Sequence, residues 1–114
     1  MMGIPKPFDI TVSEYETYVL VRLCGEFDLA AVEAVETTLV PLESRFPTVI
    51  LDLREVTFLD STGLRAIVSA DARSRKNGFE LKIVRGSADV QKLLYLAGLD
   101  KILPLIDADE LPAG

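Results

Sequence analysis

The segment FLDSTGL, residues 58–64, places an acid, two hydroxyls and a glycine between an apolar run and a segment with helical spacing. Ser61 would therefore stand at the start of a helix, where unpaired backbone N–H groups and the helix dipole favour negative charge. A phosphate on Ser61 would add about −1.5 to −2 of charge without melting the helix. Gly63 leaves space nearby for a phosphate or another backbone. These residue types are suited to a serine that is phosphorylated to switch a surface.

The same residues also fit a purely structural role. Asp60 or Ser61 would cap the helix, because Ser, Thr and Asp are common N-cap residues. Gly63 would then be a packing glycine, with nothing in the segment modified. The spacing alone leaves both interpretations open.

Composition excludes several kinds of catalytic and metal site. The chain has no histidine, the commonest general base near neutral pH and the commonest metal ligand. The single cysteine, Cys24, excludes an intramolecular disulfide and a multi-cysteine metal site, and its apolar strand-like surroundings predict a small buried hydrophobe. No glycine-rich phosphate loop appears and Ser61 has no base to activate it, so we predict neither an enzyme nor a cofactor.

Charge and hydropathy argue against nucleic acid and against membrane insertion. The net charge is −6, and the sequence has no basic stripe of the kind that binds a phosphate backbone. The N-terminal residues MMGIPKPFD lack the apolar core of a signal peptide, and no run is long enough to span a bilayer. We expect the chain to fold alone in the reducing cytoplasm.

Alternating strand and helix patterns surround FLDSTGL and must position it. Asp28 and Ser87 are the expected N-caps of the first and third helices, and Pro41 is expected to end or kink the first. The expected elements are strands over residues 8–13 and 18–24, a helix over about 29–42, a buried strand over 49–53, a helix from FLDSTGL to about 76, a strand over 79–83, a helix over about 88–97 and a short strand within 102–106.

This order predicts an α/β fold, a single domain with a mixed four- or five-stranded sheet packed with helices. We assign residues 8–106 to the domain, 1–7 to an N-terminal extension and 107–114 to a C-terminal tail. The expected buried stripes of the three helices are Leu29, Val32, Val35, Leu39 and Leu42; Leu64, Ile67, Val68 and Ala72, with Gly63, Ala66 and Ala70 for close packing; and Val90, Leu93, Leu94 and Ala97.

Five short segments form a more specific pattern along the chain: GEFD at 25–28, VILDL at 49–53, DSTGL at 60–64, LKIV at 81–84 and LYLAGL at 94–99. Together they resemble the anti-sigma factor antagonist family of STAS domains, over about residues 8 to 106. The resemblance implies a STAS-type fold, and DSTGL is its most specific part.

In that family, the serine after the aspartate is phosphorylated by a partner that is both an anti-sigma factor and a serine kinase of the ATPase fold. The resemblance therefore identifies Ser61 as the phosphoacceptor, with Thr62 as a less favoured second acceptor. It implies that the unmodified form binds the anti-sigma factor and frees the sigma factor, that phosphorylation prevents binding, and that a serine phosphatase resets the switch. The implied partner-binding residues are Asp28, Asp60, Ser61, Thr62, Gly63 and Leu64.

Two other interpretations remain. A non-switching STAS domain would be an accessory subunit of a lipid or anion transporter, with Ser61 only a helix cap. A phosphoaspartate receiver would use Asp52 as its acceptor, but it needs further acids to hold Mg²⁺ and a suitably placed lysine. Asp9 lies on the wet face of its strand and Lys101 follows a helix, so the sequence argues against a receiver.

Overall fold

The computed structural model describes residues 7–112 as a five-stranded sheet with three α-helices and a short 3₁₀ turn. Residues 1–6 of the predicted N-terminal extension and 113–114 of the predicted tail lie outside the described residues. The elements are β1 (Asp9–Glu14), β2 (Tyr18–Phe27), α1 (Leu29–Glu43), β3 (Thr48–Leu59), α2 (Ser61–Asn77), β4 (Glu80–Val84), α3 (Ala88–Leu96), β5 (Leu105–Ile106) and η1 (Ala108–Glu110).

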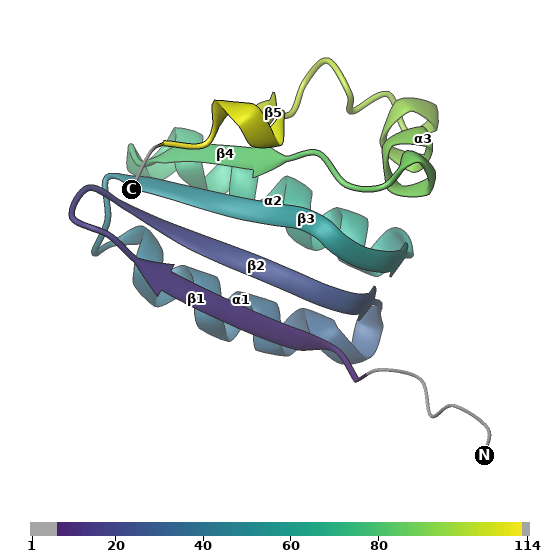
Figure 1. Cartoon of the computed structure of the whole chain (residues 1–114), viewed down its shortest axis with the longest axis horizontal. Helices are drawn as coiled ribbons and strands as arrows, with labels where there is room; N and C mark the ends of the chain where they lie inside the picture. Colours follow the sequence, from purple (N-terminus) through teal and green to yellow (C-terminus); the bar gives the residue numbers. More distant parts are fainter. Residues whose placement is uncertain (1–6, 113–114) are drawn as a thin grey trace.

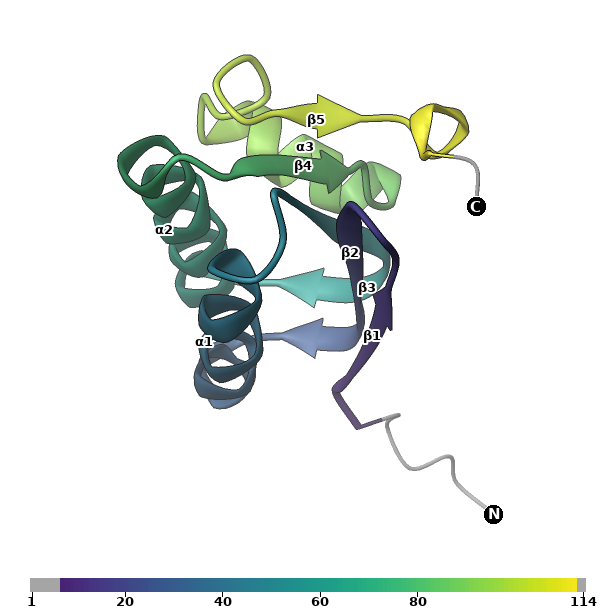
Figure 2. The ribbon, with the colours of Figure 1, turned by 90° about the vertical axis from the view of Figure 1, so that its left-hand side faces the viewer.

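The strands lie in the order β1-β2-β3-β4-β5, with β1 antiparallel to β2 and the other neighbours parallel. Figure 1 shows the sheet with α1 and α2 behind it, and Figure 2 shows both helices on the same side of the sheet. The predicted mixed α/β sheet is confirmed, and β5 makes the strand count five.

The hydrophobic core lies between the sheet and the helices α1 and α2. Val35 and Leu39 of α1 and Ile67 of α2 are almost wholly buried against it. The predicted central strand is confirmed, because Val49 and Ile50, which point to opposite faces of β3, are both fully buried. Burying one aliphatic side chain of this size contributes about 1.5–3 kcal/mol, so this layer dominates the stability of the domain.

The predicted buried stripes of the helices are confirmed for most of their residues, but three predicted positions are exposed. Leu29 begins α1 with 71% of its surface exposed, because it lies about 200° round the helix from buried Ala31. The buried face of α2 starts at Gly63 rather than Leu64, since only a glycine fits against the sheet there, and Ala72 is consequently exposed. Ala97 is also exposed, as the C-cap of α3.

Two local features differ from expectation, the position at which α1 ends and the burial of Cys24. Pro41 does not end α1, which continues to Glu43; a proline in the last turn removes only one intrahelical hydrogen bond. Cys24 is half-buried rather than buried, because alternate side chains of β2 point away from the helices.

The strand β3 is longer and less regular than predicted. It continues to Leu59, and between two of its pairings with β2 it carries an extra residue. Arg22 pairs with Asp52 and Cys24 with Glu55, so β3 advances three residues while β2 advances two. This is a β-bulge, and a second register shift follows nearer the end of the strand. The bulges determine which side chains of β3 face solvent just before FLDSTGL ends the strand.

Candidate functional site

The ends of β2 and β3 lie side by side, and each leads directly into a helix. Phe27 pairs with Leu59 in parallel register, so the following residues, Asp28 and Asp60, lie at the same edge of the sheet. They are the N-cap residues of α1 and α2, both in extended conformation. The backbone N–H of Asp60 also donates to the carbonyl oxygen of Phe27 at 3.4 Å. Parallel strand pairing therefore brings the two acids of the predicted site together.

Asp60 holds the first turn of α2 with a single carboxylate oxygen. Its Oδ1 accepts the backbone N–H of Thr62 at 2.9 Å, that of Gly63 at 3.0 Å and the hydroxyl of Thr62 at 2.5 Å. The bond from the Thr62 hydroxyl, with the Gly63 amide and smaller contributions from the Thr62 and Leu29 amides, lowers the pKa of Asp60 below its ordinary value despite some desolvation. Asp60 is therefore an ionised N-cap at neutral pH.

Ser61 is the first residue of α2 and is exposed. Within residues 7–112, no side chain or backbone group forms a hydrogen bond with its hydroxyl. The structure thus gives the capping role to Asp60 and leaves Ser61 unused by the fold. Thr62 and Leu64 on either side of Gly63 are half-buried.

Gly63 is where α2 touches the end of β2. A Cβ atom at this position would lie 2.4 Å from the carbonyl oxygen of Phe27 and 2.8 Å from Cδ1 of Leu59. Such contacts are far inside van der Waals distance, and the backbone oxygen has no freedom to move away. The glycine therefore permits a close approach between helix and strand, which is the packing role considered for it in the sequence.

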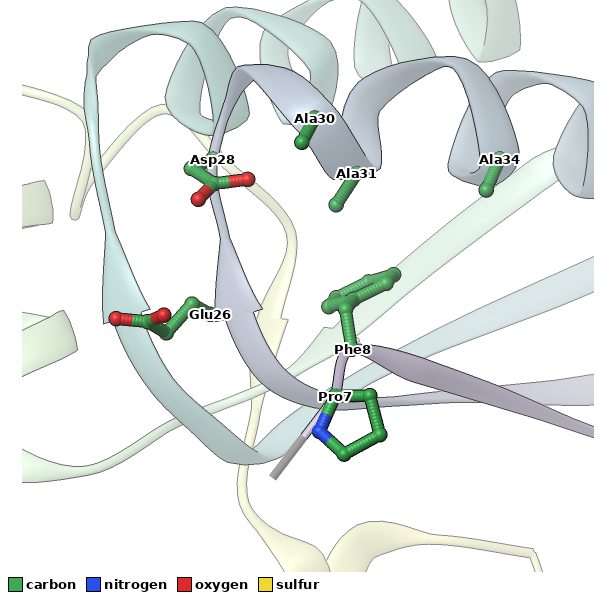
Figure 3. A pocket seen from close by; sticks show the side chains of 7 residues that line it. All are labelled: Pro7, Phe8, Glu26, Asp28, Ala30, Ala31 and Ala34. Atoms are coloured by element: carbon green, nitrogen blue, oxygen red, sulfur yellow. The ribbon is translucent and has the colours of Figure 1, made fainter. Parts of the chain in front are cut away.

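Asp28 differs from Asp60 although both are N-caps. Its side chain makes no capping hydrogen bond, while its carbonyl oxygen accepts the N–H of Ala31 at 3.0 Å. Asp28 and Glu26 both line one end of a hollow of about 360 Å³, with their carboxylates apart from each other (Figure 3). The floor is apolar, with Phe8 lying below the alanines of α1. The lining residues are Pro7, Phe8, Glu26, Asp28, Ala30, Ala31 and Ala34.

The sequence missed two apolar side chains exposed at this edge. Leu29 follows Asp28 and is 71% exposed, and Phe58 near the end of β3 is 49% exposed. Phe58 lines a second hollow, of about 220 Å³, together with Asp89, Val90 and Leu93 of the α3 region. Phe58 was not identifiable, because the irregular register of β3 breaks the alternation on which strand faces are predicted. Leu29 was assigned to the core from helical spacing alone.

Asp52 has surroundings that do not suit a phosphoacceptor. It has no exposed surface, and it accepts hydrogen bonds from Arg22 Nε and from Nε, Nη2 and the backbone N–H of Arg54. Burial raises the pKa of Asp52, but the hydrogen bonds from Arg54 and Arg22 outweigh burial and hold the pKa below its ordinary value. Among the described residues, no three His, Cys, Asp or Glu side chains are grouped to hold a metal ion. The burial of Asp52 and its pairing with two arginines do not suit the acceptor of a phosphoaspartate receiver.

Comparison with known proteins assigns the chain to a family. The STAS domain family matches residues 9–110. RsfB of Mycobacterium tuberculosis, an anti-sigma-F factor antagonist, is 32% identical over 108 residues, which cover 91% of this chain and 85% of the relative. The chain belongs to the anti-sigma factor antagonist family of STAS domains. Members of this family are non-enzymatic regulators, so the prediction of a non-enzymatic protein is confirmed.

Solved structures share the architecture of this STAS domain. An anti-sigma factor antagonist from Mycobacterium paratuberculosis superposes with a TM-score of 0.80 at 24% identity, covering 96% of this chain and 94% of that one. SpoIIAA, described as a Bacillus cell fate determinant, has been solved unphosphorylated and phosphorylated, with TM-scores of 0.75 and 0.70. The identities are 22% and 21%, over 90% of this chain and 90% and 93% of SpoIIAA. At such identities these likenesses show the fold.

No helix of this STAS domain within residues 7–112 is both long enough and apolar enough to cross a bilayer.

Proposed function

We propose that this STAS domain is a phosphorylation-controlled antagonist of an anti-sigma factor. The unphosphorylated form binds an anti-sigma factor that is also a serine kinase of the ATPase fold, and binding releases the sigma factor. Phosphorylation of Ser61 ends binding, and a serine phosphatase restores it. The proposal places the protein in the cytoplasm. The observation that carries it is the exposed, unused hydroxyl of Ser61 beside a cap that Asp60 already provides.

A phosphate at Ser61 would not need to disturb the fold. The first turn of α2 offers a positive dipole end, and no intramolecular bond of Ser61 has to break. Support for a modified state comes from SpoIIAA, a structural neighbour solved in a phosphorylated form. The switch would therefore act on the surface presented to the partner.

The charges around Ser61 explain how one phosphate changes binding. Asp60 lies next to it in sequence, and Asp28 lies at the same edge of the sheet, so a new dianion would stand near two carboxylates, with Arg65 one turn further along α2. Moving a partner from almost wholly bound to almost wholly free requires about 5.5 kcal/mol of differential affinity. Burying an unpaired dianion among carboxylates at an interface costs several kcal/mol, which is of that order. The proposed contact surface comprises Asp28, Asp60, Ser61, Thr62, Gly63 and Leu64.

The test is affinity capture from lysate of the native host, depleted of ATP and supplied with ADP. The immobilised forms are wild type, Ser61→Ala, Ser61→Asp and, as a charge-matched control, Ser44→Asp. Ser44 is an exposed serine after the opposite end of α1. We expect an ATPase-fold serine kinase to be retained by every form except Ser61→Asp.

Two results would contradict the proposal. Capture of the kinase by Ser61→Asp as well as by wild type would mean that charge at residue 61 does not control binding. Capture of lipid or anion transporter subunits by all four forms alike would favour the non-switching accessory role, with Ser61 irrelevant to partner choice.

A further inference from the structure

The two hydroxyl side chains of the DSTGL segment are held in different ways. The Ser61 hydroxyl is exposed and free of hydrogen bonds to residues 7–112. The Thr62 side chain is half-buried, and its Oγ1 lies 2.5 Å from Oδ1 of Asp60. Although the two residues are neighbours in sequence, only one of the two oxygens is available to an incoming group.

Asp60 fixes the direction of that bond. An ionised carboxylate has no proton to donate, so the Thr62 hydroxyl must be the donor and the carboxylate the acceptor. The same oxygen is also held by the backbone N–H groups of Thr62 and Gly63, and these bonds keep the carboxylate from following Thr62 if its side chain rotates. A hydrogen bond to a charged acceptor is about twice as strong as one between neutral groups.

Phosphoryl transfer makes specific demands on the accepting hydroxyl. Its oxygen attacks the γ-phosphorus of a nucleoside triphosphate held by the kinase, so that a new O–P bond forms. The bond from that phosphorus to the β,γ-bridging oxygen breaks, the nucleoside diphosphate leaves with the electron pair, and a base of the kinase takes the hydroxyl proton. Thr62 meets these demands only after it breaks its bond to Asp60 and turns outward. Ser61 meets them as it stands.

We propose that Asp60 is a positioning residue that selects the phosphoacceptor, by holding Thr62 out of reach and leaving Ser61 as the reacting hydroxyl. This inference rests on the proposed function, because the reaction is the phosphorylation assigned there. Beyond that function, it states why one hydroxyl of the segment reacts and not the other. The choice depends on the contact between Thr62 and Asp60 rather than on recognition by the kinase.

The test is the ratio of phosphothreonine at 62 to phosphoserine at 61, measured by mass spectrometry after reaction with ATP and the kinase captured above. The ratio is internal to each variant, so it does not depend on how tightly that variant binds. We expect it to rise about tenfold or more in Asp60→Gly, as expected from losing one hydrogen bond to a charged group. Asp60→Asn keeps an acceptor oxygen for Thr62 and should retain most of the wild-type selectivity.

A double variant removes the competing serine. Ser61→Ala should not be phosphorylated, whereas Ser61→Ala combined with Asp60→Gly should be phosphorylated on Thr62. An unchanged ratio in Asp60→Gly, or equal labelling of both residues in wild type, would overturn the inference.

The Thr62 hydroxyl can also be tested without a kinase. Its proton should exchange with water about tenfold or more slowly than that of Ser61 in NMR spectra of the wild-type protein, and Asp60→Gly should abolish the difference. Equal exchange in wild type would refute the inference whatever the kinase does. Slow exchange at Thr62 together with no phosphorylation of wild type by any captured kinase would instead refute the proposed function, and acceptor selection with it.

Discussion

Asp52 and Asp60 lie on the same strand and its immediate end, yet their surroundings differ in kind. Asp52 has no exposed surface and is satisfied by two arginine side chains and one backbone amide. Asp60 is half-exposed and is satisfied by the first turn of a helix and by Thr62. Both have a lowered pKa. Hydrogen bonds stabilise the ionised form of both carboxylates, but only Asp60 has a free hydroxyl, that of Ser61, next to it.

The difference follows from where the partners come from. The bulge in β3 frees the backbone N–H of Arg54, and Asp52 accepts it at 3.0 Å while the arginine side chains cover the carboxylate. The partners of Asp60 are N–H groups of the first turn of α2, and this arrangement leaves the next residue, Ser61, at the surface. We therefore interpret Asp52 as a stabilising residue of the sheet and Asp60 as the N-cap of α2 beside the proposed phosphoacceptor.

The largest effect expected from this comparison is the loss of Asp52. Asp52→Ala leaves two arginines without their carboxylate and the Arg54 amide without an acceptor, so the free energy of unfolding should fall by about 3 kcal/mol. This is the lower end for a broken buried pair, because both arginines are 38–43% exposed and partly screened. Urea unfolding measures the loss, with exposed Glu55→Ala as the control. If Asp52→Ala lost no more free energy of unfolding than Asp60→Ala, the two acids would not differ in their structural roles.

Gly63→Ala comes next. The added Cβ would lie 2.4 Å from a backbone oxygen of β2, so α2 must shift, and we expect a loss of about 1–3 kcal/mol. Thermal unfolding beside Arg65→Ala, an exposed position of the same helix, measures it. Equal stability of the two variants would mean that the contact between α2 and β2 is looser than the structure shows.

Loss of the cap should cost less. Asp60→Ala removes the acceptor of two amides and one hydroxyl and should lower the free energy of unfolding, whereas Asp60→Gly should cost less because glycine is tolerated at N-cap positions. Urea unfolding of both variants measures the difference. If alanine and glycine were equally harmful, the carboxylate would matter for more than capping.

Protonation of Asp52 by acid should lower the free energy of unfolding by only a fraction of the loss in Asp52→Ala, because acid removes the charge but not the side chain. With its pKa lowered by folding, Asp52 contributes stability above its unfolded pKa of about 3.9, and that stability is lost as the pH falls through the lower folded value. Between pH 6 and pH 3, the free energy of unfolding should therefore fall less in Asp52→Asn than in wild type. Parallel curves for the two proteins would contradict the ion pair.

The smallest change is expected at the proposed switch residue. The Ser61 hydroxyl makes no hydrogen bond within residues 7–112, so Ser61→Ala should alter the free energy of unfolding by less than about 0.5 kcal/mol. Urea unfolding beside wild type measures it. A larger loss would show that Ser61 supports the fold after all and would weaken its assignment as a free acceptor.

Most of the sheet and helix order was predictable, because hydrophobic periodicity survives in each element. Residue type also predicted where α2 ends, at Gly78 with a φ of 81°, and that Ser87 caps α3. The exposure of Phe58 was not, because a bulge leaves no mark in a single sequence. The contact of Arg22 with Asp52 was also not predictable, because Arg22 lies thirty residues away along the chain.

At the candidate site, the sequence predicted a set of residues but not the different contacts that each of them makes. Asp60 and Ser61 were both candidates for the N-cap, and only the structure assigns the cap to Asp60. The bond from Thr62 to Asp60 was not anticipated, because it depends on a side-chain rotamer. Whether Ser61 is modified and which partner it meets stay predictions.

The close approach of Gly63 to the Phe27 carbonyl also determines what a mutational survey would detect. A library selected for solubility or expression alone would retain almost any amino acid at position 61 and would favour glycine strongly two residues later. Its tolerance map would mark the packing glycine as the sensitive position and the proposed regulatory serine as the tolerant one. For a domain built in this way, the regulatory residue is found by selecting for partner binding and comparing the two maps.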